Sequence, residues 1–418
     1  MGLVTAAIPF FLLAVLIELA LDRWRGWGLY RLNDAIGSLG AGILSRILGL
    51  VRVGILVLLY IPLYQWLEPV YRQLGISWSL DNPWHLLLAV IAYDFCYYWK
   101  HRVSHEINIF WAEHLVHHQS EDYNLTTALR QSSDLVPLGW IFYLPLLLIG
   151  LPWELLVTAG AIDLIYQFWV HTQKIPAFKR GMRWMEWILV TPSNHRVHHA
   201  QNKVYVDRNY GGVLIIWDRL FGTYQEELDE EPCIYGVRKP LNSFDPLAAN
   251  LQHFKRMWLD AVYTKSWKEK LTLWFRATGY RPADAEAAMP VPSCDLANFQ
   301  RYDPKVARGL RWYALAQHLV YSIATLALLQ YGKTLDYATT ALLVLMLVAG
   351  LVVNGRILDG EVRTRLWEPG RLGALLAALP LLPQATWAAV AGYCVASAAL
   401  WWWLVFNGKG DTVTPVSH

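Results

Sequence analysis

The sequence predicts an all-α protein, a polytopic bundle of membrane helices with a histidine-rich site for two metal ions on the cytoplasmic side. Three observations lead to this prediction. Hydrophobic residues make up 55% of the 418 residues and charged residues 17%, a more apolar composition than that of an ordinary soluble domain. Several apolar runs approach the roughly 20 residues that a membrane-spanning helix needs. Most of the 13 histidines stand in two short windows beside such runs.

The apolar runs form two groups along the chain. The N-terminal group has runs at residues 3–21, 35–66, 84–99, 135–150 and 153–170. Its last two runs predict a helical hairpin, because Pro152 stands between them and proline does not continue a helix. The C-terminal group has runs at residues 313–331, 338–353 and 372–406, the last of which we expect to be divided at Pro380 and Pro383.

Residues 100–134 and 171–311 are polar enough to lie outside the bilayer. We therefore predict a catalytic domain over residues 1–254, a charged connector over 255–311, and a C-terminal helical block over 312–418.

Basic residues predict the orientation in the membrane, because short cytoplasmic loops are enriched in Lys and Arg. The histidine-bearing segments are flanked by Lys100, Arg102, Arg130, Lys174, Lys179, Arg180 and Arg183. The turn at residues 150–152 carries no charge. The histidines should then face the cytoplasm of a bacterial inner membrane or an endoplasmic reticulum. The run 153–170 should return His171 to the same side.

The two windows hold imidazoles at helical spacing. The first contains His101, His105, His114, His117 and His118, and the second contains His195, His198 and His199. Spacings of three and four residues place side chains on one face of a helix. Neutral imidazole binds Fe, Zn, Cu or Ni, and eight such ligands exceed what one ion takes, so the count predicts two ions. The isolated His85, His253 and His318 are interpreted as structural.

The ligand type favours oxidation over hydrolysis. No HExxH motif supplies a carboxylate base, and a structural zinc would need only four ligands. Soluble di-iron bundles use several carboxylates, whereas the boxes here consist of imidazoles, with Glu106 adjoining the first of them. A histidine-bound metal pair at the mouth of a membrane bundle suits O2 activation against a lipid C–H bond. The alternative outside the enzymes is a metal-binding transporter, which would place its histidines at mid-membrane on broken helices.

Six segments resemble a known family. They lie at residues 94–99, 101–106, 120–132, 166–172, 191–199 and 209–223. The histidine boxes are the signature of the fatty acid hydroxylase/sterol desaturase superfamily, and the six segments are most similar to its alkylglycerol monooxygenase family. The resemblance is strong over about residues 90–250. Asn194 departs from the pattern, since the eukaryotic members have another histidine there.

The resemblance implies roles for individual residues. His171 would join the eight histidines of the windows to form a nine-imidazole cage. Glu106 would be a ligand, a hydrogen-bond acceptor or a pterin contact, and it is a candidate catalytic residue together with Asn194. Ligating imidazoles need an acceptor on their other nitrogen. The candidates for such support, or for contact with the polar head of the substrate, are Asp94, Asp122, Asn124, Asn194 and Arg130. The simpler interpretations are that Asn124 closes a turn and Asp94 pairs with a basic group.

The implied reaction is a monooxygenation with two iron ions and O2. The chain has no flavin, haem or iron–sulfur motif, so electrons should come from tetrahydrobiopterin or another external two-electron donor. Attack on the carbon next to the ether oxygen of an alkylglycerol would give a fatty aldehyde and glycerol. The alternative within the superfamily is a sterol or fatty acyl hydroxylase or desaturase with a reductase partner. The net charge of +3 gives no indication of a nucleic-acid partner.

Overall fold

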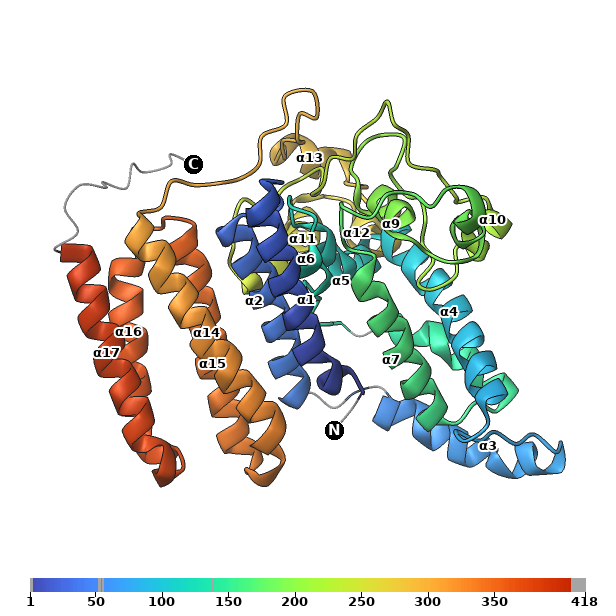
Figure 1. Ribbon diagram of the computed structural model, residues 1–418, viewed down its shortest axis with the longest axis horizontal. Helices are drawn as coiled ribbons and strands as arrows, with labels where there is room; N and C mark the ends of the chain where they lie inside the picture. Colours follow the sequence, from blue (N-terminus) through green and yellow to red (C-terminus); the bar gives the residue numbers. More distant parts are fainter. Residues whose placement is uncertain (1–2, 52–53, 55, 137, 407–418) are drawn as a thin grey trace. The chain divides into compact units, whose positions relative to one another are not determined.

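The computed structural model describes residues 3–51, 54, 56–136 and 138–406, and these form helices and turns with three isolated β-bridges and no strand (Figure 1). The prediction of an all-helical protein is confirmed. The chain divides into two compact units. Unit 1 comprises Met1–Tyr30, Val53–Pro240 and Asn250–Phe299, and unit 2 comprises Arg31–Arg52, Leu241–Ala249 and Gln300–His418.

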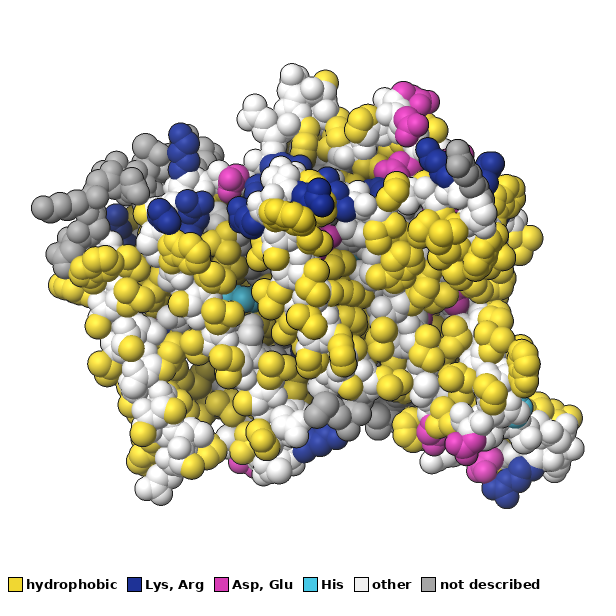
Figure 2. Space-filling model, viewed as in Figure 1, with side chains coloured by type: hydrophobic (Ala, Val, Ile, Leu, Met, Phe, Trp, Pro, Cys, Tyr) yellow, Lys and Arg dark blue, Asp and Glu magenta, His cyan; other side chains and the backbone are white. Residues whose placement is uncertain are grey.

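Among the described residues, five helices are long and apolar enough to cross a membrane. They are α1 (Leu3–Arg25), α2 (Leu32–Val51), α14 with the 3₁₀ turn after it (Arg308–Thr334), α15 (Tyr337–Leu358) and the segment Gln384–Val405, which holds most of α17 (Trp387–Phe406). On α1, large apolar side chains such as Phe10 and Leu16 are exposed, and Figure 2 shows hydrophobic side chains along this helix. The protein is therefore an integral membrane protein.

Three apolar runs of the N-terminal group differ from their expected form. The run 35–66 is not one helix, since α2 ends at Val51 and a π-helix (Leu56–Tyr60) leads into α3 (Ile61–Gln73). The run 135–150 forms a 3₁₀ helix, Leu138–Ile149, instead of a membrane-spanning α-helix. The run 84–99 belongs to a longer helix, α4 (Pro83–Glu106), that continues into the polar histidine segment. Apolar composition alone predicted neither the break nor the tighter helix.

In unit 1 the helix α4 is the central element, packing against α5 (Asn108–His118), α7 (Trp153–Trp169) and the 3₁₀ helix. The expected hairpin turn is present, with Gly150 at φ +66° and Pro152 as the N-cap of α7. Buried tyrosines fix this turn, because the hydroxyl of Tyr60 donates to the carbonyl of Leu151 at 2.8 Å and that of Tyr71 to Leu147 at 2.6 Å. The turn therefore directs α7 back along α4, and His171 follows directly after α7.

A buried carboxylate ties α1 to the rest of unit 1. Glu18 accepts hydrogen bonds from the backbone N–H of Leu125 at 2.9 Å and from the hydroxyl of Thr172 at 2.6 Å. Leu125 begins the short helix α6 (Leu125–Ala128), and Thr172 follows His171. The C-terminal end of α1, where Arg23 and Arg25 lie, is thus held beside the histidine-bearing segments.

The polar part of unit 1, after His171, contains several short helices. It contains α8 (Met185–Ile188), α9 (Pro192–His199), α10 (Ile216–Phe221), α12 (Trp267–Thr272), α13 (Ala283–Ala288) and, from Asn250 onward, α11 (Pro246–Tyr263). Residues 250–299 pack in unit 1, so the segment predicted as a connector over 255–311 is largely part of the unit that holds the histidines.

Unit 2 contains α2, α14 (Arg308–Tyr331), α15, α16 (Thr364–Ala377) and α17. The division expected at Pro380 and Pro383 is present between α16 and α17. Helix α2 packs on α14 and α15 through Leu44, Ile47 and Leu351. Contacts between segments distant in the sequence therefore place α2 in one unit with the C-terminal helices.

Candidate metal centre

The structure brings all nine predicted histidines of unit 1 into two groups, in which His114 is half-buried and the other eight are buried. The first group is His101, His105, His114, His118 and His198, and the second is His117, His171, His195 and His199. Within each group the candidate ligand atoms all lie within 4.8 Å of one another. Each group could hold one metal ion.

Two segments of the chain have the pattern HxxHH, at residues 114–118 and 195–199, and each of these boxes contributes to both groups. On α5, His114 and His118 join the first group and His117 joins the second. On α9, His198 joins the first group while His195 and His199 join the second. Adjacent residues on a helix point about 100° apart, so the final HH pair of each box serves two neighbouring centres. His118 and His199 stack with ring centroids 4.3 Å apart and connect the two groups.

The outer nitrogens of four histidines are held by backbone carbonyls. Nδ1 of His101 lies 2.7 Å from the oxygen of Tyr210, and Nδ1 of His171 lies 2.7 Å from that of Gln167. The corresponding partners of His117 and His198 are the carbonyls of Arg130 at 2.9 Å and Arg208 at 3.0 Å. A carbonyl only accepts, so each Nδ1 carries the proton and leaves Nε2 with a free lone pair. The acceptors that ligating imidazoles need are therefore backbone carbonyls at these four histidines.

These lone pairs converge. Nε2 of His114 lies 2.9 Å from Nε2 of His101 and 3.0 Å from that of His118, and Nε2 of His171 lies 3.1 Å from that of His195. The buried Nε2 atoms of His105 and His198 have no hydrogen-bond partner among the described residues. One cation placed in each group would accept the lone pairs of the nitrogens that converge there. The donor set of each group therefore fits a metal ion.

Burial keeps the imidazoles in the neutral form that binds metal. It lowers the pKa of His117 to about 4 and that of His198 to about 3. The same cause holds the pKa of His195 and of His199 well below the usual range, with neighbouring histidines adding to the effect. The groups are therefore ready ligands at neutral pH.

Asp94 supports the centre through a loop and contacts no histidine. Its carboxylate accepts from the backbone N–H groups of Val213 at 2.7 Å and Leu214 at 3.1 Å, and from the indole of Trp217 at 2.8 Å. This loop also carries Tyr210, the partner of His101. Among the described residues, Asp94 thus neither pairs with a basic group nor accepts a hydrogen bond from an imidazole.

Arg130 and Asn124 have structural contacts. The guanidinium of Arg130 is buried and donates from Nε to the carbonyl of Val116 at 2.6 Å, near the end of α5, while its own carbonyl holds His117. Asn124 is the N-cap of α6 and donates to the carbonyl of Leu29 at 2.9 Å. Asp122 is also buried, and its carbonyl accepts from Ser120. The simpler interpretation of Asn124, that it closes a turn, agrees with its capping contacts.

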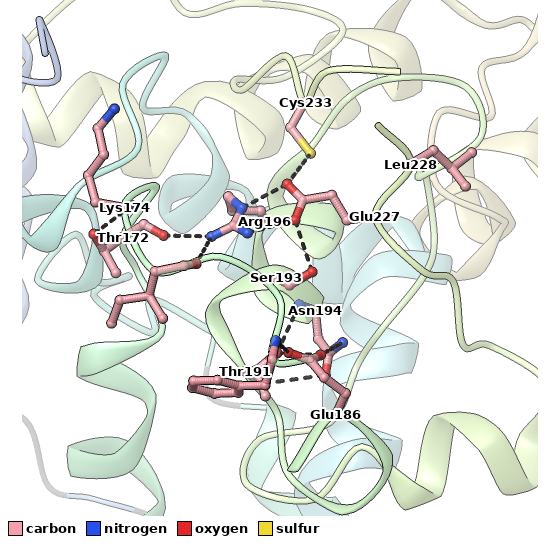
Figure 3. Close-up of polar contacts among 12 residues, drawn as sticks. Thr172, Lys174, Glu186, Thr191, Ser193, Asn194, Arg196, Glu227, Leu228 and Cys233 are labelled. Atoms are coloured by element: carbon pink, nitrogen blue, oxygen red, sulfur yellow. Dashed lines mark hydrogen bonds and ion pairs between the residues drawn. The ribbon is translucent and has the colours of Figure 1, made fainter. Parts of the chain in front are cut away.

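The two candidate catalytic residues also lack a hydrogen bond to the histidine groups. Glu106 accepts from Nε of Arg102 at 3.0 Å and from the hydroxyl of Tyr210 at 3.4 Å. The Asn194 side chain donates to Glu186 at 3.1 Å and completes a capping box with Thr191 at the start of α9 (Figure 3). Asn194 therefore fixes the helix that carries three histidines.

A buried ion pair, which sequence reasoning missed, holds the same helix. Arg196 of α9 donates to Glu227 from Nε at 2.7 Å and from Nη2 at 2.6 Å (Figure 3). Its Nη1 donates to the carbonyls of Thr172 at 3.0 Å and Ile175 at 2.8 Å, beside His171. The only signal in the sequence was the position of Arg196 among His195, His198 and His199, because its partner Glu227 lies about 30 residues further along the chain.

A cavity of about 260 Å³ adjoins the first histidine group. His105, His118 and His198 line one part of it, together with Trp111. Backbone and side chains of α11 and of residues 236–239 line another part. A small molecule in this cavity would lie against the candidate metal centre.

Comparison with known proteins agrees with the geometry. A family model described as fatty acid hydroxylase matches residues 86–223, which include all nine histidines. The chain is 36% identical to the alkylglycerol monooxygenase of Xenopus tropicalis over 364 residues, 87% of this chain and 78% of that protein. The enzyme of Danio rerio is 34% identical over 358 residues, 85% and 77% of the two chains. That of Homo sapiens is 42% identical over 281 residues, 67% and 60% of the two chains. No solved structure matches.

These relatives confirm the enzyme interpretation and set the transporter alternative aside. The matched region holds the two histidine groups, and the similarity extends over most of both chains. The protein belongs to the alkylglycerol monooxygenase family, membrane-embedded lipid monooxygenases with a fatty acid hydroxylase domain.

Proposed function

We propose that this protein is a di-iron monooxygenase that hydroxylates the carbon next to the ether oxygen of alkylglycerols. The observation that carries the proposal is the pair of buried imidazole groups inside a chain of this family. Two iron ions held by these groups would supply the activation of O2. Nine neutral imidazoles suit iron, since nitrogen ligands bind it and the carboxylate-rich sets typical of magnesium or calcium are absent from the two groups.

The overall reaction balances with one external two-electron donor. One oxygen atom enters the C–H bond next to the ether oxygen, and the other leaves as water with two electrons and two protons. The resulting hemiacetal collapses to a fatty aldehyde and glycerol. In our proposal the donor is tetrahydrobiopterin, as the family resemblance implies, and a reductase would serve in its place only if the protein were not pterin-dependent.

The chain's own residues do three things in this reaction. The neutral imidazoles bind the ions, and the carbonyls of Tyr210, Arg130, Gln167 and Arg208 hold four of them in the required tautomer. Burial of the histidines keeps bulk water from the reacting carbon. The ether oxygen of the substrate weakens the adjacent C–H bond and thereby directs the position of attack.

The test is product analysis by mass spectrometry with purified full-length protein, iron, O2, reduced pterin and 1-O-hexadecylglycerol. We expect hexadecanal and glycerol in equal amounts. A hydroxylated lipid that is not cleaved would instead favour a sterol or fatty acyl hydroxylase. Metal analysis should approach two ions per chain.

Paired histidine variants separate metal binding from general damage to the fold. His117→Ala should abolish turnover and lower the metal content. His318→Ala should retain both, because His318 lies on α14 in unit 2 and belongs to neither histidine group. Equal damage from the two variants would overturn this assignment of the histidines.

A further inference from the structure

The cavity beside the first histidine group has an uneven distribution of charge. Its lining includes three basic residues, Arg238, Lys239 and Arg256, and one acidic residue, Asp207. Asp207 lies near the histidines, with its Oδ1 3.9 Å from Nδ1 of His105. The basic residues come from the segment 236–239 and from α11, so one wall of the cavity is cationic.

The side chains of these three basic residues have no polar partner among the described residues. None of their side chains makes a hydrogen bond or ion pair with any residue that the structure describes. The nearest buried carboxylate, Asp260, is already occupied by Arg281, which donates to it from Nε at 2.9 Å and from Nη2 at 2.6 Å. Arg238 is exposed, whereas Lys239 and Arg256 are partly buried, and partly buried basic groups without an acidic partner cost stability.

The pKa values of Lys239 and Arg256 also indicate that these two cations lack a compensating negative charge. Burial, with Arg256 and Arg281 nearby, holds the pKa of Lys239 below its usual range. Burial and the charge of Arg281 do the same to the pKa of Arg256. An anion between these side chains would relieve both effects.

We propose that the cationic wall binds a phosphate or carboxylate group of a molecule whose remaining part extends toward His105, His118 and His198. The inference rests on the proposed function only in taking that molecule to be a reactant. A cavity of about 260 Å³ holds a lipid headgroup or a small soluble molecule but no long alkyl chain. The anion therefore belongs to the headgroup of a phosphorylated ether lipid, or to a soluble electron donor other than tetrahydrobiopterin, which carries neither a phosphate nor a carboxylate group.

Direct binding is the first test, and it does not require turnover. Full-length protein loaded with iron, in nanodiscs of zwitterionic phosphatidylcholine, is titrated with glycerol 3-phosphate and with glycerol. We expect saturable binding of glycerol 3-phosphate and none of glycerol. The double variant Lys239→Gln/Arg256→Gln should bind glycerol 3-phosphate at least tenfold more weakly.

The matched control is Lys255→Gln, an exposed lysine of α11 outside the cavity lining, which should bind like the unmodified protein. The melting temperature of the double variant should not fall, because unpartnered cations are removed. Unchanged binding in the double variant would show that phosphate ligates the iron or binds elsewhere, and would overturn the proposal. Absence of saturable binding to the unmodified protein would also overturn it.

Turnover then distinguishes the two sources of the anion. If it is a lipid headgroup, KM for 1-O-hexadecylglycerol 3-phosphate should be about tenfold below that for 1-O-hexadecylglycerol, and the double variant should erase the difference. If it belongs to the co-reactant, the two lipids should have equal KM and inorganic phosphate should compete with the electron donor. Binding without any turnover would refute the proposed function and leave the anion site standing.

Discussion

At the scale of single residues, hydrogen-bond direction explains how the centre is supported. Asp94 accepts three donors from residues 213–217, and burial together with the neighbouring charge of Asp94 holds the pKa of Asp163 on α7 well above its usual range. Asp163 also accepts from the side chain of Gln167 at 2.6 Å, and the carbonyl of Gln167 holds His171. Two neighbouring buried carboxylates repel each other when both are ionised, so one of the two holds a proton. The three donors to Asp94 place that proton on Asp163.

This direction predicts unequal effects of two similar substitutions. Asp163→Asn should be tolerated, because its amide N–H can donate to Asp94 as the carboxyl proton does. Asp94→Asn should lower both melting temperature and iron content, because its amide N–H would face the donors of Val213, Leu214 or Trp217. Leaving one buried donor unsatisfied costs about 1–3 kcal/mol. Melting curves and metal analysis of both variants would show the asymmetry, and equal damage would contradict the shared proton.

At the scale of elements, α9 is too short to be stable alone. It has eight residues, all of them buried, and isolated helices shorter than about 12 residues are marginal in water. Three contacts compensate: the capping box of Thr191 and Asn194, the proline at its first turn, and the ion pair of Arg196 with Glu227. The geometry of three histidines therefore depends on residues whose side-chain hydrogen bonds, within the described part of the chain, go to partners other than histidine.

We predict that Glu227→Gln disrupts the centre. The Arg196 side chain is 7% exposed, and removal of its partner leaves a buried charge uncompensated, which costs about 3 kcal/mol. Melting temperature and iron content should both fall. The control is Glu68→Gln, which breaks the exposed pair with Arg72 on α3 and should change neither value. If the two variants behaved alike, the ion pair would not position α9.

At the scale of the whole molecule, burial of nine neutral histidines makes stability depend on pH. The pKa of His117 is about 4 and that of His198 about 3, whereas an unfolded histidine titrates near 6.5. Below about pH 6.5 the unfolded chain therefore binds more protons than the folded chain, and folding becomes less favourable as pH falls. Above this value these groups have no effect.

The metal-free protein should consequently melt at lower temperature at pH 5.0 than at pH 7.5. The metal-loaded protein should keep its melting temperature to lower pH, because a bound ion competes with the proton for each Nε2. Thermal melts of both forms at several pH values would measure this. A metal-free protein that became more stable on acidification would contradict the neutral state of the buried histidines.

Orientation in the membrane is a second property of the whole molecule. The histidines of unit 1 lie beside the end of α1 that carries Arg23 and Arg25, which supports our proposal that they face the cytoplasm. In a background with Cys233 and Cys294 replaced by serine, Lys203→Cys should react only with a membrane-permeant reagent. Gln73→Cys, at the exposed end of α3, should react with an impermeant one. The opposite pattern would reverse the orientation.

The sequence by itself determined the helical class, the turn at Pro152 and the nine histidines that the structure brings together. These features are local, since hydropathy, proline and the spacing of imidazoles act within one or two turns of a helix. His171 was identified by the family resemblance and by the hairpin that returns α7. The pairing of α2 with α14 and α15 had no local signal, because apolar helices of similar composition do not specify their neighbours.

Only the tertiary structure decided how the nine histidines divide into two groups and what supports them. Backbone carbonyls are the acceptors of His101, His117, His171 and His198. Every residue carries a carbonyl, so no residue type in the sequence predicts these acceptors. Asp94 and Glu227 act on the centre through a loop and a helix that reach it from distant parts of the chain. These roles depend on which segments lie beside the centre in the folded chain. The residue types alone do not indicate them.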